Sequence, residues 1–259
     1  MGLFNGAFYF GSSLGIVAWT VLAELTGWRS SLAISGALGI LGAFLLLAYV
    51  PKDELSEDFV VTMADLRKVL SDKWLVILSL ELFGFVSGSI LINMFTVFYL
   101  EQSLKLSPVF AGAIGSLTLL FAVFTSPLMG MLYDRMRRAR LLVLCSGLGL
   151  AASLALVSVG NIYSAILATI VVGICTGCAL TVSYLSAIEV QAASAEYETL
   201  AISWVNCTQM FAGFWSPITF SLLVVSFGYT ASWLTAAGYT FLLILVILLV
   251  AEPVGKLSN

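Results

Sequence analysis

One acidic residue, Glu81, lies well inside an apolar stretch of the sequence, seven residues and so roughly 10 Å beyond Trp74. A carboxylate in lipid is costly, and an acid at membrane depth is therefore by default a candidate functional group. Such a group suits the binding of a coupling proton, and Glu81 is our candidate for that role. The alternative is a carboxylate near the inner headgroups that reaches water through a cavity.

The residues around Glu81 indicate how its helix would pack. Gly84 and Gly88 flank the face that carries Glu81 and would let a neighbouring backbone approach closely. Asn93 follows on the same stretch but lies about 120° away around a helix, so one face cannot hold both polar groups.

A second concentration of charge is the segment 130–140, in which five of eleven residues are charged, against 10% of the whole chain. It separates two long apolar stretches. Four arginines this close to a membrane boundary predict which side of the membrane is cytoplasmic.

The sequence shows no grouping of residues that is typical of an enzyme active site. The chain has no histidine, and its four cysteines all lie in apolar stretches. The spacing Cys175-x-x-Cys178 could mark a metal or redox pair, but with no histidine and no other cysteine nearby we favour helix-packing residues. We find no nucleophile–base pair and predict no catalytic residue, no metal site, no cofactor and no enzyme activity.

The elements that position these residues are membrane helices. The chain is 61% apolar with a mean hydropathy of +1.08, far above a soluble domain of 259 residues. Apolar stretches of about 20 residues recur, each long enough to cross a bilayer. We predict an all-α polytopic membrane protein with eight transmembrane helices, near 3–23, 31–50, 74–100, 108–132, 141–160, 162–187, 200–225 and 230–250.

The longest connection is 51–73, which begins with Pro51 and is rich in acidic residues. Its second part alternates apolar and charged residues in the manner of a short amphipathic helix lying at the membrane surface. The charged side of that helix is expected to be solvated.

The basic residues are distributed unevenly between the two sides. With 133–140 inside, nine lie on the inner side and two, Arg29 and Lys105, on the outer side. This bias predicts a multi-pass protein of the cell membrane with both termini in the cytoplasm. The net charge of −3 and the absence of a basic face give no indication of nucleic-acid binding.

A weak internal repeat relates the two ends of the chain. Shifted by 201 residues, Asn206 falls on Asn5 and Phe211 on Phe10, while the turn at Gly228 and Ser232 falls on that at Gly27 and Ser31. Four predicted helices lie between the copies. The repeat unit is then six helices in about 200 residues, a parallel repeat of the kind that transporters use.

On these features the chain resembles the major facilitator superfamily, whose members have two six-helix halves joined by a long cytoplasmic loop. The family's signature loop reads G-x-L-x-D-R-x-G-R-[RK]-x-[RK] and recurs in relaxed form in the second half. Arg137 stands here in place of the inner glycine. The resemblance assigns to this loop Gly130, Leu132, Asp134, Arg135, Arg138 and Arg140, and it implies a cytoplasmic gating role for the loop.

The resemblance implies a division of the chain: 1–50 as the last two helices of the first bundle, 51–73 as the central cytoplasmic loop, and 74–259 as the second bundle. Met1-Gly2-Leu3-Phe4-Asn5 is similar to the end of a segment that precedes the family's fifth helix. We therefore expect a truncated chain, and a missing four-helix segment as a possible partner beside the bilayer and a small-molecule substrate.

The resemblance also implies roles for single residues. Asp134 would contact the positive N-terminal end of the helix that starts near Asn5 and would help latch the two halves; a simple helix cap is the alternative. Relatives carry arginine where Glu198 stands, which removes a basic cytoplasmic anchor. The expected substrate-pathway residues, each also able to form an ordinary helix–helix hydrogen bond, are Asn93, Tyr184, Asn206 and Gln209.

These features predict secondary active transport of a small solute by alternating access. The alternative is an inactive remnant or a non-transporting membrane scaffold. A retinal protein is disfavoured, because it needs a lysine at mid-membrane depth and every lysine here lies in a predicted loop. The sequence does not specify the substrate, the coupling ion, the direction of transport or the oligomeric state.

Overall fold

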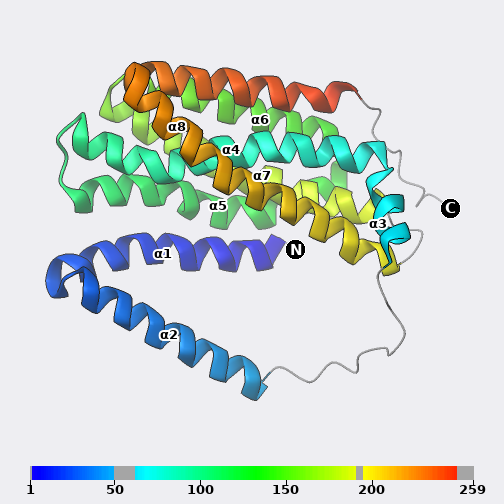
Figure 1. Ribbon diagram of the computed structural model, residues 1–259, viewed down its shortest axis with the longest axis horizontal. Helices are drawn as coiled ribbons and strands as arrows, with labels where there is room; N and C mark the ends of the chain where they lie inside the picture. The colour runs from blue at the N-terminus through cyan, green and yellow to red at the C-terminus, as the bar shows by residue number, and fades with distance from the viewer. Residues whose placement is uncertain (1, 50–61, 191–194, 250–259) are drawn as a thin grey trace.

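The computed structural model describes residues 2–49, 62–190 and 195–249, and all of its regular structure in these ranges is helical. Eight α-helices are followed by one short 3₁₀ turn (Figure 1). In chain order they are α1 (Gly2–Thr26), α2 (Trp28–Tyr49), α3 (Met63–Leu70), α4 (Lys73–Gln102), α5 (Pro108–Met136), α6 (Ala139–Val157), α7 (Ile162–Val190), α8 (Ala195–Leu245) and η1 (Val246–Leu249).

Seven of the described helices, all except α3, are long and apolar enough to span a membrane. The longest, α8, is interrupted at Gly228, where φ is 77° and ψ is 172°. The chain reverses there, so that a first arm (195–227) and a second arm (229–245) run in opposite directions (Figure 1). With α8 divided at Gly228, the described residues therefore contain eight apolar helical segments, which agrees with the eight predicted from hydropathy.

Local chemistry explains where several helices begin and end. The Asp72 carboxylate caps α4 by accepting hydrogen bonds from the backbone N–H groups of Trp74 (2.9 Å) and Leu75 (3.1 Å). Ser107 caps α5, whose first residue is Pro108, a position where the missing N–H of proline costs nothing. At the other end of α5, Arg137 adopts a left-handed conformation with φ 51° and ψ 35°.

That conformation explains the glycine in the family's signature loop. Arg137 stands where the loop normally has glycine, and glycine is the residue that enters the left-handed region without steric cost.

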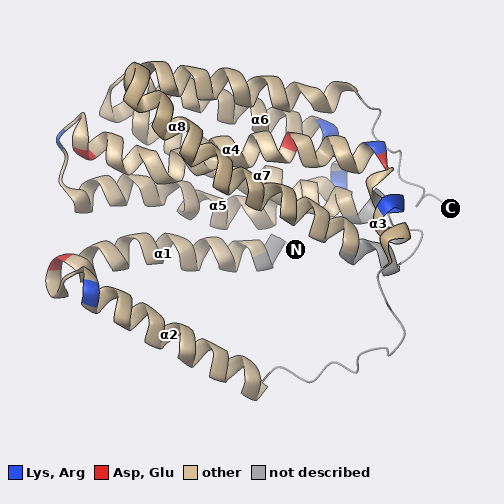
Figure 2. Ribbon diagram, in the orientation of Figure 1, with Lys and Arg blue, Asp and Glu red and all other residues tan. Residues whose placement is uncertain are grey.

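The helices cross the molecule side by side, and the turns alternate between two ends (Figure 1). We call the end that carries α3 and the α5–α6 turn the α3 end, and the opposite end the Gly228 end. Figure 2 shows that the described basic residues gather mostly at the α3 end. Seven lie there, against Arg29 and Lys105 at the Gly228 end: Arg67, Lys68, Lys73, Arg135, Arg137, Arg138 and Arg140. Lys52 and Lys256 lie outside the described residues.

Helices α5 and α7 approach each other closely at two glycines of α7. A Cβ atom added at Gly173 would collide with the carbonyl oxygen of Thr118, and one added at Gly177 would collide with the side chain of Thr125. The two glycines are four residues apart, the spacing that lets helix backbones approach closely in membranes. A hydrogen bond of 2.6 Å between Ser126 and Thr181 joins the same two helices.

Two clusters of buried side chains make up most of the interior. The cluster at the α3 end is built around Trp74, Leu78 and Val182, and the one nearer the Gly228 end around Phe85, Phe220 and Trp233. Helix α1 packs along α5, with Gly6 against the Val123 carbonyl, whereas α2 contacts mainly α1.

The predicted amphipathic helix in 51–73 corresponds to α3, eight residues that lead directly into α4. The acidic part of that connection, residues 51–61, lies outside the described residues.

Candidate transport site

Three of the four predicted pathway residues come together where α7 meets the first arm of α8. The Tyr184 hydroxyl donates a hydrogen bond of 2.6 Å to Asn206 Oδ1. Gln209 Nε2 donates to the Tyr184 hydroxyl oxygen at 2.6 Å and to Asn206 Oδ1 at 2.5 Å. We call these three residues the amide–tyrosine cluster.

Helix geometry positions the cluster. Asn206 and Gln209 are three residues apart, so both side chains leave the same face of α8. Tyr184 lies two residues before Ser186, whose hydroxyl accepts a hydrogen bond of 3.1 Å from Trp74 Nε1 at the start of α4. The cluster is therefore nearer the α3 end than the Gly228 end.

The cluster keeps hydrogen-bonding capacity for another molecule. All three side chains are half-buried. Asn206 Nδ2 and Gln209 Oε1 form no hydrogen bond with any described residue, which leaves one donor group and one acceptor atom in the cluster. No charged side chain takes part in the cluster's hydrogen bonds.

Helix α1 brings a further tyrosine to this place. Tyr9 is 3% exposed, and its helix contacts α7, the helix that carries Tyr184. No sequence signal marks Tyr9, because it stands in an apolar stretch whose partner helix cannot be known from periodicity. The cluster thus lies where α1 faces α7.

Asn93 is not part of the cluster. It lies four residues beyond Ser89 of α4, which bonds Thr176 of α7 at 3.2 Å, whereas Tyr184 is close to the Trp74–Ser186 contact. The separation along the bundle is roughly 20 Å. Asn93 is half-buried, and its Oδ1 is buried without a hydrogen-bond partner among the described residues.

Glu81 is fully buried, and neither carboxyl oxygen has a hydrogen-bond partner among the described residues. Its face of α4 also carries Gly84 and Gly88, which lie against Leu243 and Thr240 in the second arm of α8. The close approach expected at the two glycines is therefore present and involves side chains of α8. Glu81 points into this helix packing and makes no contact by hydrogen bond with the amide–tyrosine cluster.

The predicted gating loop joins α5 to α6 at the α3 end. Asp134 and Arg135 are exposed in the last turn of α5, and Arg138 is exposed at the residue before α6. Arg140 Nη2 donates a hydrogen bond of 2.9 Å to the carbonyl oxygen of Leu248, so it caps η1, the last helical turn among the described residues. Gly130 packs against Thr181 of α7.

Two expectations for this end remain predictions. The Asp134 carboxylate forms no hydrogen bond with the described residues of α1, and the side chains of the first four residues lie outside the described part. The Glu198 side chain is also outside it.

The cysteines are all free. Cys175 and Cys178 are buried in α7, and the Cys178 thiol lies 3.7 Å from the Leu142 carbonyl oxygen of α6. Their surroundings are those of helix-packing residues. The described residues contain no group of three or more cysteine, aspartate or glutamate side chains that could hold a metal ion.

Comparison with known proteins identifies the family to which this chain is similar. An uncharacterized transporter of Buchnera aphidicola (subspecies Acyrthosiphon pisum, strain APS) is 29% identical over 150 residues, a match that covers 55% of this chain and 36% of that relative. The sequence profile described as Major Facilitator Superfamily matches residues 77–259, which is most of the chain and includes α4 from its second turn, α5, α6, α7 and both arms of α8. The chain therefore belongs to the Major Facilitator Superfamily, a family of membrane transporters.

Proposed function

We propose that this chain takes part in secondary active transport of a small polar solute across the cell membrane by alternating access. The observation that carries the proposal is the amide–tyrosine cluster, which offers an unsatisfied donor and acceptor at half-buried positions. A neutral hydrogen-bonding site in a membrane bundle suits a solute with hydroxyl, amide or similar polar groups.

The cluster's position supports alternating access. It lies where α1 contacts α7, and α1 packs mainly on α5. We assign α1 and α2 to a first bundle and α4 to α8, from residue 74 onward, to a second. Rocking of one bundle against the other would then open and close the space beside the cluster.

The orientation follows from the charge distribution. We propose that the α3 end is cytoplasmic, because the described basic residues gather there. In a cysteine-free background, Arg138→Cys should react with an impermeant maleimide only from inside, and Leu104→Cys only from outside. Labelling of position 138 from outside would contradict this orientation.

Glu81 is our proposed coupling group. Because it forms no hydrogen bond with the amide–tyrosine cluster, we assign its action to the packing of α4 against the second arm of α8, not to direct contact with solute. Glu81→Gln keeps the shape and removes the titrating group. It should abolish solute uptake driven by a pH gradient but largely spare equilibrium exchange; equal residual fractions in both assays would reject the coupling role.

The transport proposal is tested in proteoliposomes with a mixture of small polar metabolites, whose uptake is read by mass spectrometry. We expect a solute that accumulates with the wild-type chain and not with Gln209→Ala. The chain is assayed alone and co-expressed with a four-helix fragment from the first half of a superfamily member. Uptake that needs the fragment supports the expected partner, and uptake by the chain alone contradicts that expectation. No uptake in either preparation contradicts transport and favours a scaffold.

A further inference from the structure

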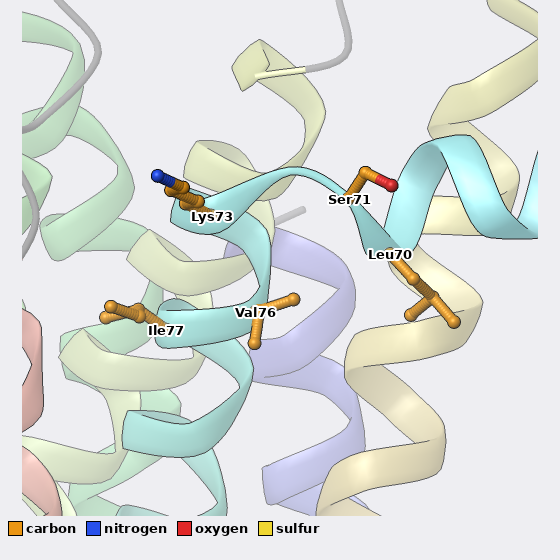
Figure 3. A pocket seen from close by; sticks show the side chains of 5 residues that line it. All are labelled: Leu70, Ser71, Lys73, Val76 and Ile77. Atoms are coloured by element: carbon orange, nitrogen blue, oxygen red, sulfur yellow. The ribbon is translucent and has the colours of Figure 1, made fainter.

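An open pocket of about 300 Å³ lies where α3 joins α4, at the α3 end. Figure 3 shows the side chains that line it: Leu70, Ser71, Lys73, Val76 and Ile77. The two arms of α8 diverge from Gly228 toward this end (Figure 1), and in the first turns of α4 the Lys73 and Val76 side chains remain exposed.

One face of α4 changes from charged to apolar at the pocket. Lys73, Val76, Ile77 and Leu80 follow one another at the helical spacing i, i+3, i+4 and i+7, so they form a single stripe. Val76 and Leu80 are 39% and 40% exposed, so the apolar part of this stripe is open at the surface. Lys73 thus stands at the edge of a lipid-facing surface.

The polar groups beside Lys73 form hydrogen bonds within the chain, and the Lys73 ammonium is the cationic group at the pocket. The Asp72 carboxylate accepts the two backbone N–H groups that it caps, and the Ser71 hydroxyl donates to the Arg67 carbonyl oxygen at 2.7 Å. Lys73 is exposed and forms no salt bridge with a described residue. The exposed Arg67 on α3 adds a second positive charge to this end of the helix.

We propose that the α3–α4 pocket binds one anionic glycerophospholipid. Its phosphate pairs with the Lys73 ammonium at the membrane surface, and an acyl chain lies along Val76, Ile77 and Leu80. This combination matches a lipid because a charged group and an apolar stripe adjoin in the order of headgroup and acyl chain. The proposal does not depend on the transported solute.

The test is lipid retention by the purified chain, measured by native mass spectrometry, with thermal unfolding in micelles as the second readout. The probes are dioleoyl phosphatidylglycerol, dioleoyl phosphatidylcholine and inorganic phosphate. One basic residue near the surface contributes about fivefold in lipid affinity. We therefore expect the chain to bind phosphatidylglycerol with about fivefold higher affinity than phosphatidylcholine. Its unfolding temperature should also rise more with phosphatidylglycerol.

Matched variants assign the effect to the pocket. Lys73→Gln should remove the preference for phosphatidylglycerol, Lys73→Arg should keep it, and Lys105→Gln at the opposite end should leave it unchanged. Val76→Trp, which fills the pocket, should reduce retention of both lipids. The proposal is overturned if Lys73→Gln keeps the preference, if the two lipids bind equally, or if inorganic phosphate stabilises the chain as well as the lipid does.

Discussion

The hairpin of α1 and α2 and the hairpin formed by the two arms of α8 have similar turns but differ in how they pack against other helices. Gly27 and Gly228 have φ values of 83° and 77°. Ser31 donates its hydroxyl to the Gly27 carbonyl oxygen at 3.1 Å, and Ser232 does the same to Gly228 at 2.7 Å. The pairs are related by the 201-residue repeat, so the turns match as the repeat predicts.

The second helix of each hairpin has a different environment. Leu243 and Ile244 of α8 lie against Gly84 of α4 and Gly147 of α6. In α2, only 6% of the apolar span is buried, and nothing lies within 4 Å of a Cβ added at Gly36, Gly39 or Gly42. The turn is therefore determined by a few local residues, whereas the position of the following helix depends on the helices available to pack against it.

The largest effect expected from this difference concerns two glycine-to-alanine substitutions, which should change the free energy of unfolding in opposite directions. Gly147→Ala should destabilise the chain by about 1–3 kcal/mol, because the new Cβ would lie 2.6 Å from Ile244 Cγ2. Gly39→Ala meets no neighbour and should not destabilise; alanine favours a helix over glycine by about 1 kcal/mol. Thermal unfolding in micelles, followed by circular dichroism, checks both. Equal losses would show that α2 is packed as tightly as the second arm of α8.

The turns themselves should respond alike. Gly27→Ala and Gly228→Ala each place a Cβ on a residue with positive φ, at a cost of roughly 1–3 kcal/mol. The same unfolding assay measures the two losses. A loss at only one position would mean that the two turns are not equivalent.

A smaller effect is expected at the serines. Ser31→Ala and Ser232→Ala each remove a hydrogen bond to the turn glycine, worth about 0.5–1 kcal/mol. Ser232 is fully buried and should show the larger value. Unfolding of the double variant should give the sum, since the two turns share no partner.

The smallest change concerns a left-handed position that has no glycine. Arg137→Gly should relieve the φ of 51° but lose the contact of Arg137 Nε with the Asp134 carbonyl oxygen, for a net gain below about 1 kcal/mol. Arg137→Ala keeps the unfavourable φ and loses the contact, so it should destabilise. If alanine and glycine have equal effects on the unfolding temperature, the strain argument fails.

The sequence predicts the spans well, because lipid requires about 20 apolar residues for each crossing. It also contains the positions of the turns, in Gly27 and Gly228. It also contains two glycines four residues apart, Gly173 and Gly177. This spacing is typical of close helix packing in membranes and could have indicated the α5–α7 contact. It does not predict the tilt of α2, which depends on long-range packing.

For the site, the sequence supplies the candidates but not their grouping. Tyr184, Asn206 and Gln209 converge, whereas Asn93 lies far along the bundle and Tyr9 joins from α1. Rotation about each helix axis decides which polar side chains meet. In spans that are apolar on every face, hydrophobic periodicity carries little information about that rotation.

The most direct test of the central claim asks whether water reaches the amide–tyrosine cluster. In a cysteine-free background, Asn206→Cys is treated with an impermeant maleimide from each side of the membrane. Two controls on the same helix are Ala212→Cys, which is fully buried, and Phe214→Cys, which is 64% exposed on an apolar surface. A water-lined transport pathway predicts rapid labelling of position 206 from the α3 end and little labelling of 212 or 214. If position 206 resists labelling as the controls do, the cluster is only a helix contact and the proposed transport site is wrong.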